Sequence, residues 1–127
     1  MTTMSPPRTY TILLVDDQPD FLALARELLA EHPGLQVVGE ATDDKSAMEL
    51  LIRLQPDVAI LDVYMPWVSG FTLCRKMLDL QPNLRVIMTS SHDDRQYHVM
   101  AAKLGAKAFL HKNRLSARSV ADILEPP

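Results

Sequence analysis

Three absences narrow the classes of protein to which this chain can belong. Cys74 is the only cysteine, so no intrachain disulfide can form, and a lone thiol fits the reducing cytoplasm. No stretch approaches the roughly 18 consecutive apolar residues that a membrane-spanning helix needs. The 13 basic residues do not exceed the 16 acidic ones, whereas a free-standing nucleic-acid-binding domain usually has a basic excess. We therefore expect a cytoplasmic domain that itself binds neither a membrane nor nucleic acid.

Length and composition are those of one ordinary globular domain. The 127 residues lie within the usual range of about 100–200 per domain, with 47% hydrophobic and 23% charged residues. The opening segment has no apolar core of the kind found in a secretory signal. We predict a flexible lead-in over residues 1–8, one domain over 9–124, and a tail or the start of a linker over 125–127.

Apolar runs alternate with helical patterns along the chain. Runs such as YTILLV at residues 10–15 are typical of strands buried on both faces, as in parallel sheets. The predicted strands cover residues 10–15, 35–40, 57–61, 84–90 and 106–111, and the predicted helices cover 20–31, 44–55, 71–80, 94–104 and 115–124. Five βα units predict a doubly wound α/β fold with a five-stranded parallel sheet and right-handed crossovers.

Several side chains are assigned to packing and not to chemistry. Met48, Met77 and Met100 lie at predicted core positions of helices, and Cys74 is expected to be a small buried hydrophobe. Trp67 follows the third strand, where partial packing and contact with a partner are both open.

Polar and charged side chains follow four of the predicted strands. In an open parallel sheet, ligands bind beside the carboxyl ends of the strands. Asp16 and Asp17 follow the first strand, Asp62 the third, Ser90 the fourth and Lys112 the fifth. An aspartate pair alone is more often a helix cap or a solvated turn. Five such groups at one edge, however, rarely arise by chance, so we expect a site there.

The chemistry of these groups points to phosphoryl transfer. Three adjacent carboxylates repel one another unless a cation neutralises them. Oxygen ligands without histidine or cysteine suit Mg²⁺, and a lysine with a hydroxyl beside it would bind an oxyanion. One carboxylate would then act as the nucleophile and form an acyl phosphate.

Four segments carry a resemblance to a known family. They are LLVDDQPD (13–20), DVAILDVYMPWVSG (57–70), RVIMTSSHDD (85–94) and GAKAFLHK (105–112). With them, the chain resembles the receiver domain of a bacterial two-component response regulator over about residues 8–124. The resemblance implies the flavodoxin-like strand order 2-1-3-4-5 of chemotaxis regulators. It also implies a signalling switch, phosphorylated by a histidine kinase or phosphotransfer protein, that catalyses only its own phosphorylation and dephosphorylation.

The resemblance implies a role for each residue of the site. Asp62 is the expected phosphoacceptor, Asp17 a direct Mg²⁺ ligand, and Asp16 an acidic partner acting through water. Tyr64 is expected to offer its backbone carbonyl to the metal. The residues expected to contact the phosphoryl group or to respond to it are Ser90, Lys112 and Phe109.

The expected response lies in the last helices and strand. Movement of Ser90 and rotation of Phe109 would change the face made by the fourth helix, fifth strand and fifth helix, which also allows a homodimer. Residues 92–94 (HDD) resemble regulators with a LuxR-type helix-turn-helix, so transcription through such a domain, absent from these 127 residues, is one expected output. Two departures from the family are Phe109, where tyrosine is frequent, and Asn113, where many receivers have a cis proline.

Tyr64 and His92 are expected to tune dephosphorylation. They lie two residues after Asp62 and Ser90, both are large, and neither carries a carboxylate or amide to orient water. Steric exclusion of water therefore predicts a long-lived phosphorylated form, although a neutral imidazole could act as a weak base.

Three alternatives to this signalling switch stay open. A phosphatase of haloacid-dehalogenase type usually has a second aspartate two residues after the nucleophile, where this chain has Tyr64. A flavodoxin-like cofactor carrier would have a phosphate loop in place of Asp16 and Asp17, which repel phosphate. A degenerate receiver that acts only as a docking module would not need all five site positions filled.

Overall fold

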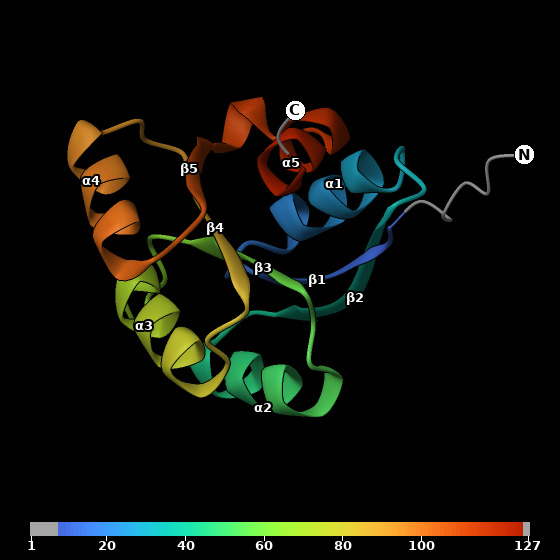
Figure 1. Cartoon of the computed structure of the whole chain (residues 1–127). Helices are drawn as coiled ribbons and strands as arrows, with labels where there is room; N and C mark the ends of the chain where they lie inside the picture. The colour runs from blue at the N-terminus through green and yellow to red at the C-terminus, as the bar shows by residue number, and fades with distance from the viewer. Residues whose placement is uncertain (1–7, 126–127) are drawn as a thin grey trace, which may run out of the picture.

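A computed structural model describes residues 8–125 as a sheet with helices on both faces (Figure 1). The strands are β1 (Tyr10–Val15), β2 (Leu35–Ala41), β3 (Val58–Asp62), β4 (Arg85–Ser90) and β5 (Ala108–His111). All pair in parallel in the order β2-β1-β3-β4-β5, which confirms the predicted doubly wound fold. From β1, the chain moves to β2 on one side and then crosses back to β3 on the other, so the direction of winding reverses between β1 and β3. Ligands bind at the carboxyl ends of strands at such a point, which is where the site is expected.

The helices divide between the two faces of the sheet. They are α1 (Pro19–Leu29), α2 (Asp44–Leu54), α3 (Gly70–Leu80), α4 (Arg95–Leu104) and α5 (Ala117–Leu124), with a 3₁₀ turn over Lys112–Arg114. α1 and α5 cover one face, whereas α2, α3 and α4 pack on the other (Figure 1). Within residues 8–125, no helix has the length and apolar character that crossing a bilayer requires.

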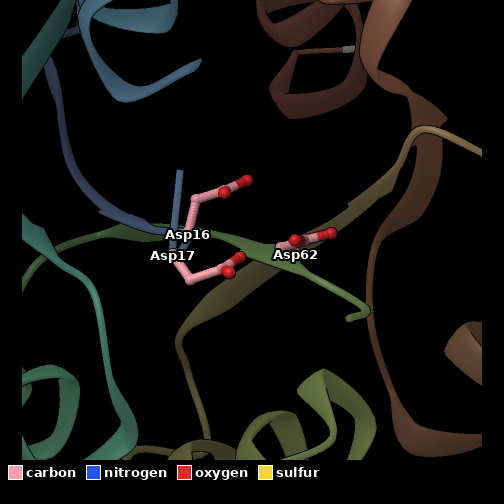
Figure 2. Close-up of side chains that lie close together, drawn as sticks. All are labelled: Asp16, Asp17 and Asp62. Carbon is pink, nitrogen blue, oxygen red and sulfur yellow. The ribbon is translucent and has the colours of Figure 1, made fainter. Parts of the chain in front are cut away.

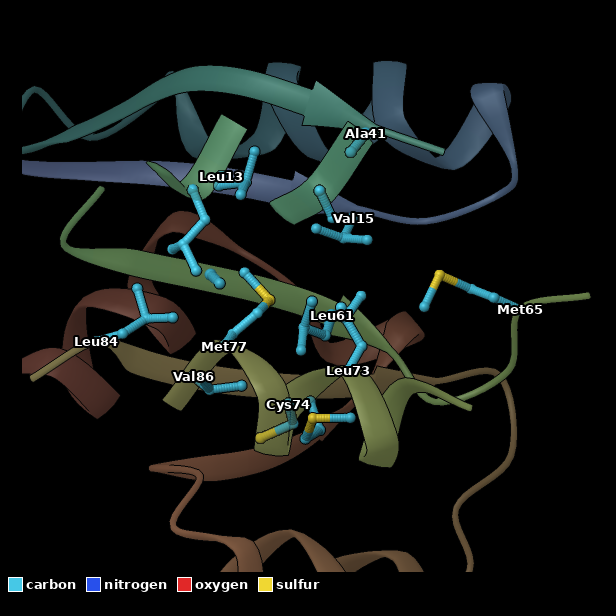
Figure 3. Packing of buried hydrophobic residues seen from close by; sticks show 14 of the residues in the cluster. Leu13, Val15, Ala41, Leu61, Met65, Leu73, Cys74, Met77, Leu84 and Val86 are labelled. Carbon is cyan, nitrogen blue, oxygen red and sulfur yellow. The ribbon is translucent and has the colours of Figure 1, made fainter. Parts of the chain in front are cut away.

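Each face of the sheet has its own hydrophobic core. Leu13 and Val15 of β1 point toward the α2–α4 side (Figure 3), and Ile12 and Leu14 point toward α1 and α5. Successive residues of a strand face opposite sides of the sheet, and helices cover both sides. All four side chains are therefore almost fully buried. This explains why the strand sequence is continuously apolar and does not alternate.

Element ends differ from the sequence prediction where local chemistry decides them. α1 begins one residue early because Pro19 suits the first helical turn, and it ends at Leu29 rather than at residue 31. α5 begins at Ala117 rather than at residue 115, because Ser116 caps it in a capping box with Ser119. Gly105 ends α4 in the left-handed conformation, as its position predicts.

One packing prediction is wrong. Met100 is 44% exposed on α4, where Ala101 is the only buried residue. Met77 and Cys74 are fully buried, as predicted, and Met48 packs partly against the same core. A helix at the edge of the sheet buries only a narrow stripe of its surface. The hydrophobic pattern of its sequence therefore predicts more buried residues than the fold contains.

The predicted lead-in and tail lie outside the described residues except at their inner ends. There, the Arg8 guanidinium lies 4.5 Å from the centre of the Tyr10 ring. The Tyr10 hydroxyl donates to the Glu125 carboxylate at 3.0 Å. The domain boundaries themselves stay a prediction.

Candidate functional site

Three carboxylates meet at the carboxyl edge of the sheet (Figure 2). Asp16 and Asp17 directly follow β1, and Asp62 is the last residue of β3. One oxygen from each of them lies within 4.8 Å of the others. β1 and β3 pair in register up to Val15 and Leu61, so the chain leaves the sheet at the same level in both strands. The predicted convergence of the three aspartates is therefore present in the fold.

Lys112 brings a positive charge to this acidic cluster. Its Nζ lies 2.7 Å from Asp16 Oδ2 and 3.5 Å from Asp62 Oδ2. The ammonium also lies 4.3 Å from the centre of the Phe21 ring of α1. Since the Lys112 side chain is almost fully buried, water screens these interactions little. One lysine does not balance three carboxylates, and the cluster keeps an excess of negative charge.

The donor set fits a divalent cation. Asp16 Oδ1 accepts the Gln18 backbone N–H at 2.9 Å, whereas Asp16 Oδ2 is buried with Lys112 close by but no hydrogen bond of good geometry. A buried carboxylate oxygen without a hydrogen bond is costly, and a cation would satisfy it. The ligands are all oxygen atoms, the donors that Mg²⁺ prefers.

The electrostatics of Asp62 reflect its crowded position. Burial, and then the neighbouring charge of Asp16, raise the pKa of Asp62 from 3.8 to about 6. The Lys112 ammonium and the Tyr64 backbone N–H oppose this rise in the pKa. A cation among the three carboxylates would favour the ionised form, which is the nucleophilic one.

A cleft of about 390 Å³ opens beside Asp62 and Lys112. Ser90, the last residue of β4, lines this cleft, and its Oγ accepts the His92 backbone N–H at 3.0 Å. Asp17, Tyr64 and His92 also line it. The cleft therefore brings predicted metal-binding, phosphate-contacting and water-excluding residues to one place, with ample room for a phosphoryl group.

An aromatic cluster leads from the cleft to α4 and β5. The Tyr64 and His92 rings meet edge-on with their centres 6.5 Å apart, and the Tyr64 hydroxyl hydrogen-bonds the Tyr97 hydroxyl of α4. The Tyr97 ring centre lies 5.8 Å from that of Phe109 in β5. The hydrogen bond to Tyr64 raises the pKa of Tyr97 to about 12. Phe109 is thus linked to the cleft through a neighbouring tyrosine.

Two residues of this region escape sequence reasoning. Tyr97 carries no motif and looks like one more amphipathic helix residue. His111 belongs to no metal-ligand or catalytic motif, yet both of its ring nitrogens have backbone partners in the loops of the site. A polar residue at the end of an apolar strand is the one sequence signal that His111 gives.

Comparisons with known proteins agree with this geometry. A family model described as the response regulator receiver domain matches residues 12–123. The transcriptional regulatory protein DegU of Brevibacillus brevis is 34% identical over 101 residues, which are 80% of this chain and 43% of DegU. A protein-glutamate methylesterase/protein-glutamine glutaminase of Thiobacillus denitrificans is 36% identical over 110 residues, 85% of this chain and 31% of that protein. The chain thus spans less than half of each of these curated relatives.

A solved structure shares both fold and sequence. The signal receiver domain of the response regulator NarL from Mycobacterium tuberculosis matches with a TM-score of 0.84 and 30% identity. The match covers 95% of this chain and 100% of that one. The residues 12–123 matched by the family model contain the three aspartates and the lysine described above. This chain belongs to the response regulator receiver domain family.

Proposed function

We propose that this chain is a phosphorylation-dependent switch that accepts a phosphoryl group on Asp62. The observation that carries the proposal is the convergence of Asp16, Asp17 and Lys112 around Asp62 at one edge of the sheet. The donor is a phosphohistidine, supplied by a histidine kinase or a phosphotransfer protein, as membership of the family implies.

The acidic cluster would hold Mg²⁺ through Asp17, Asp62 and the backbone carbonyl of Tyr64, with Asp16 acting through water. The metal supplies charge neutralisation for the carboxylate and the incoming phosphoryl oxygens. Asp16 also pairs with Lys112 at 2.7 Å, which holds the ammonium at the rim of the cleft. With the cluster neutralised in this way, the Lys112 ammonium would be able to pair with a phosphoryl oxygen.

Transfer requires one bond to form as another breaks. An oxygen of Asp62 attacks the phosphorus in line with the leaving nitrogen, so an oxygen–phosphorus bond replaces the phosphorus–nitrogen bond. The imidazole of the donor leaves with the electron pair and takes up a proton from water. Lys112 and the Ser90 hydroxyl stabilise the equatorial oxygens, a task of positioning and charge neutralisation.

The phosphorylated state would be read on the face made by α4, β5 and α5. Ser90 Oγ now accepts the His92 N–H, and a turn of this hydroxyl toward the phosphoryl oxygens would release that contact. Phe109 and Tyr97, which pack on each other, would then rearrange at the surface of α4. The same face is the surface through which a second copy could pair.

The output is a property of the longer proteins to which such domains belong. The two curated relatives are named as a transcriptional regulator and as a methylesterase, so one receiver type serves different outputs. We propose that this chain transforms no other substrate and controls an attached or separate partner. Tyr64 in place of a second acid argues against the haloacid-dehalogenase phosphatase reaction.

The test is a phosphorylation assay with a matched carboxylate control. The chain is incubated with Mg²⁺ and either acetyl phosphate or a phosphorylated histidine kinase, and its intact mass is measured. We expect one phosphoryl adduct, lost in Asp62→Asn and in EDTA but retained in Asp122→Asn, an exposed aspartate of α5. An adduct that persists in Asp62→Asn, or forms equally well in EDTA, contradicts the proposal.

A further inference from the structure

His111, the last residue of β5, joins two loops of the site through both nitrogens of its ring. Nδ1 accepts the backbone N–H of Asn113 at 3.0 Å, and Nε2 lies 2.8 Å from the backbone carbonyl oxygen of Ser91. An N–H can only donate and a carbonyl oxygen can only accept. The two partners therefore fix one neutral tautomer, with the proton on Nε2.

The two loops joined in this way deliver the residues expected to contact phosphate. Ser91 directly follows Ser90, and Lys112 lies between His111 and Asn113 in the chain. Backbone pairing of β4 with β5 ends at Ser90 and His111. The imidazole thus continues the connection between the two strands at the point where the backbone ladder stops.

The His111 side chain also caps the turn that follows β5. Residues 112–114 form a 3₁₀ turn, and His111 is the cap that accepts its Asn113 N–H. Proline at position 113 would lack the N–H that the ring accepts. The cap and the Ser91 contact together restrict how the backbone presents Lys112 to Asp62, whose carboxylate lies 3.5 Å from Lys112 Nζ.

We propose that His111 is a positioning residue for phosphoryl transfer, which sets the spacing of the Ser90 and Lys112 loops across the cleft. The proposal rests on the proposed function of Asp62. His111 does not line the cleft, so it would act through its neighbours and not on the phosphoryl group. Its effect would fall on the rate of transfer, because the aspartates that hold the metal lie on other strand ends.

Three variants separate the two contacts of the ring. His111→Leu removes both, His111→Asn keeps an acceptor near Nδ1 for the Asn113 N–H, and His111→Gln keeps a donor that can reach the Ser91 carbonyl. We expect His111→Leu to lower the phosphorylation rate constant at saturating acetyl phosphate about five- to tenfold, as the loss of one or two modest hydrogen bonds implies. The Asn and Gln variants should each recover part of this loss. Mg²⁺ affinity, measured by calorimetry, should stay within about twofold of the wild type, since the carboxylates are unchanged.

The chain offers a matched control in His32. Its Nδ1 accepts the Gly34 backbone N–H at 2.8 Å, the same cap two residues on, at the opposite edge of the sheet beside the start of β2. His32→Leu should leave the phosphorylation rate constant unchanged even where it lowers the melting temperature.

Other outcomes would overturn the inference. One is a His111→Leu rate equal to that of the wild type. Another is a rate loss matched by an equal loss of Mg²⁺ affinity, which would show a general structural role. A wild type that is not phosphorylated would instead overturn the proposed function itself.

Discussion

At the scale of the residue, Asp62 is a carboxylate whose ionised form is disfavoured both by burial and by a neighbouring negative charge. Its side chain is almost fully buried, Asp16 lies beside it, and together they raise the pKa of Asp62 to about 6. Without metal, the fold therefore keeps a proton on Asp62 up to about pH 6, whereas phosphoryl transfer needs the ionised carboxylate. The repulsion between the carboxylates destabilises the metal-free fold, and the same negative charge attracts a cation.

Neutralising this one charge should stabilise the metal-free fold. Because the folded pKa lies above the unfolded value of 3.8, the contribution of protonated Asp62 is present below pH 4 and lost as the pH rises through about 6. Asp62→Asn should therefore resemble the wild type at pH 4 and be more stable at pH 7. The full shift in the pKa of Asp62 corresponds to about 3 kcal/mol, which is the upper limit of this gain at pH 7.

The measurement is urea unfolding in EDTA followed by far-ultraviolet circular dichroism, because Trp67, the single tryptophan, is 79% exposed in the folded chain. Glu49→Gln, an exposed carboxylate of α2, serves as the control and should change little. Mg²⁺ should stabilise the wild type more than Asp62→Asn, since a bound ligand stabilises the state that binds it. A variant less stable than the wild type at pH 7 in EDTA would contradict this account of the site.

At the scale of the element, the loops after β3 and β4 are tied to α4 by aromatic side chains. Tyr64 is 58% exposed, yet its hydroxyl is bonded to Tyr97 and its ring meets His92 edge-on. These contacts hold Tyr64 across the cleft, whereas a free side chain would swing into solvent. We therefore propose that both loops would block water from a phosphorylated Asp62.

We expect that opening this barrier shortens the life of the phosphorylated state. Replacing Tyr64 with Asn and His92 with Glu removes bulk and adds groups that can orient water. Phosphate loss should then accelerate about tenfold, a modest gain for one better-oriented water. Intact mass, followed over time after the donor is removed, gives the rate. Gln96→Glu adds the same charge on α4 outside the cleft and should have no effect. An unchanged rate in the double variant, with phosphorylation intact, would rule out gating here.

At the scale of the whole molecule, burial is unevenly distributed over the sheet. β1 and β3 are buried on both faces, whereas all residues of β5 are half-buried, and α4 buries only Ala101. The α4–β5 edge therefore buries little surface, so it can rearrange at low cost. It is also the part that the aromatic cluster joins to the cleft.

A phosphoryl mimic should therefore move this edge and leave the sheet centre in place. With Mg²⁺ and beryllofluoride, we expect amide resonances to shift across residues 101–121 as well as around Asp62. Residues of β2 and α2, on the far side, act as the internal control. Shifts confined to the loops around Asp62 would show that the site is not coupled to the α4–β5–α5 face.

Much of the fold could be predicted because each βα unit carries its own local signals. Buried parallel strands are continuous apolar runs, and Gly105 caps α4 as its position predicts. Either Asp43 or Asp44 could cap the second helix from its position, and the structure has Asp43 as the cap. Two predictions fail for different reasons. Met100 looks like a core residue in its helix, but within residues 8–125 nothing covers that side of α4. α5 starts two residues later than predicted because Ser116 caps it.

The sequence by itself determined the order of strands and helices, and which polar residues follow each strand. It therefore also determined the identity of the acidic cluster, because parallel strands end at one edge of the sheet. Only the tertiary structure decided that Lys112 pairs with Asp16 at 2.7 Å, that Tyr64 bonds Tyr97, and that His111 joins the Ser91 and Asn113 backbones. These contacts join residues of different loops and elements. Their geometry depends on how the sheet twists and how α4 packs, which no local pattern encodes.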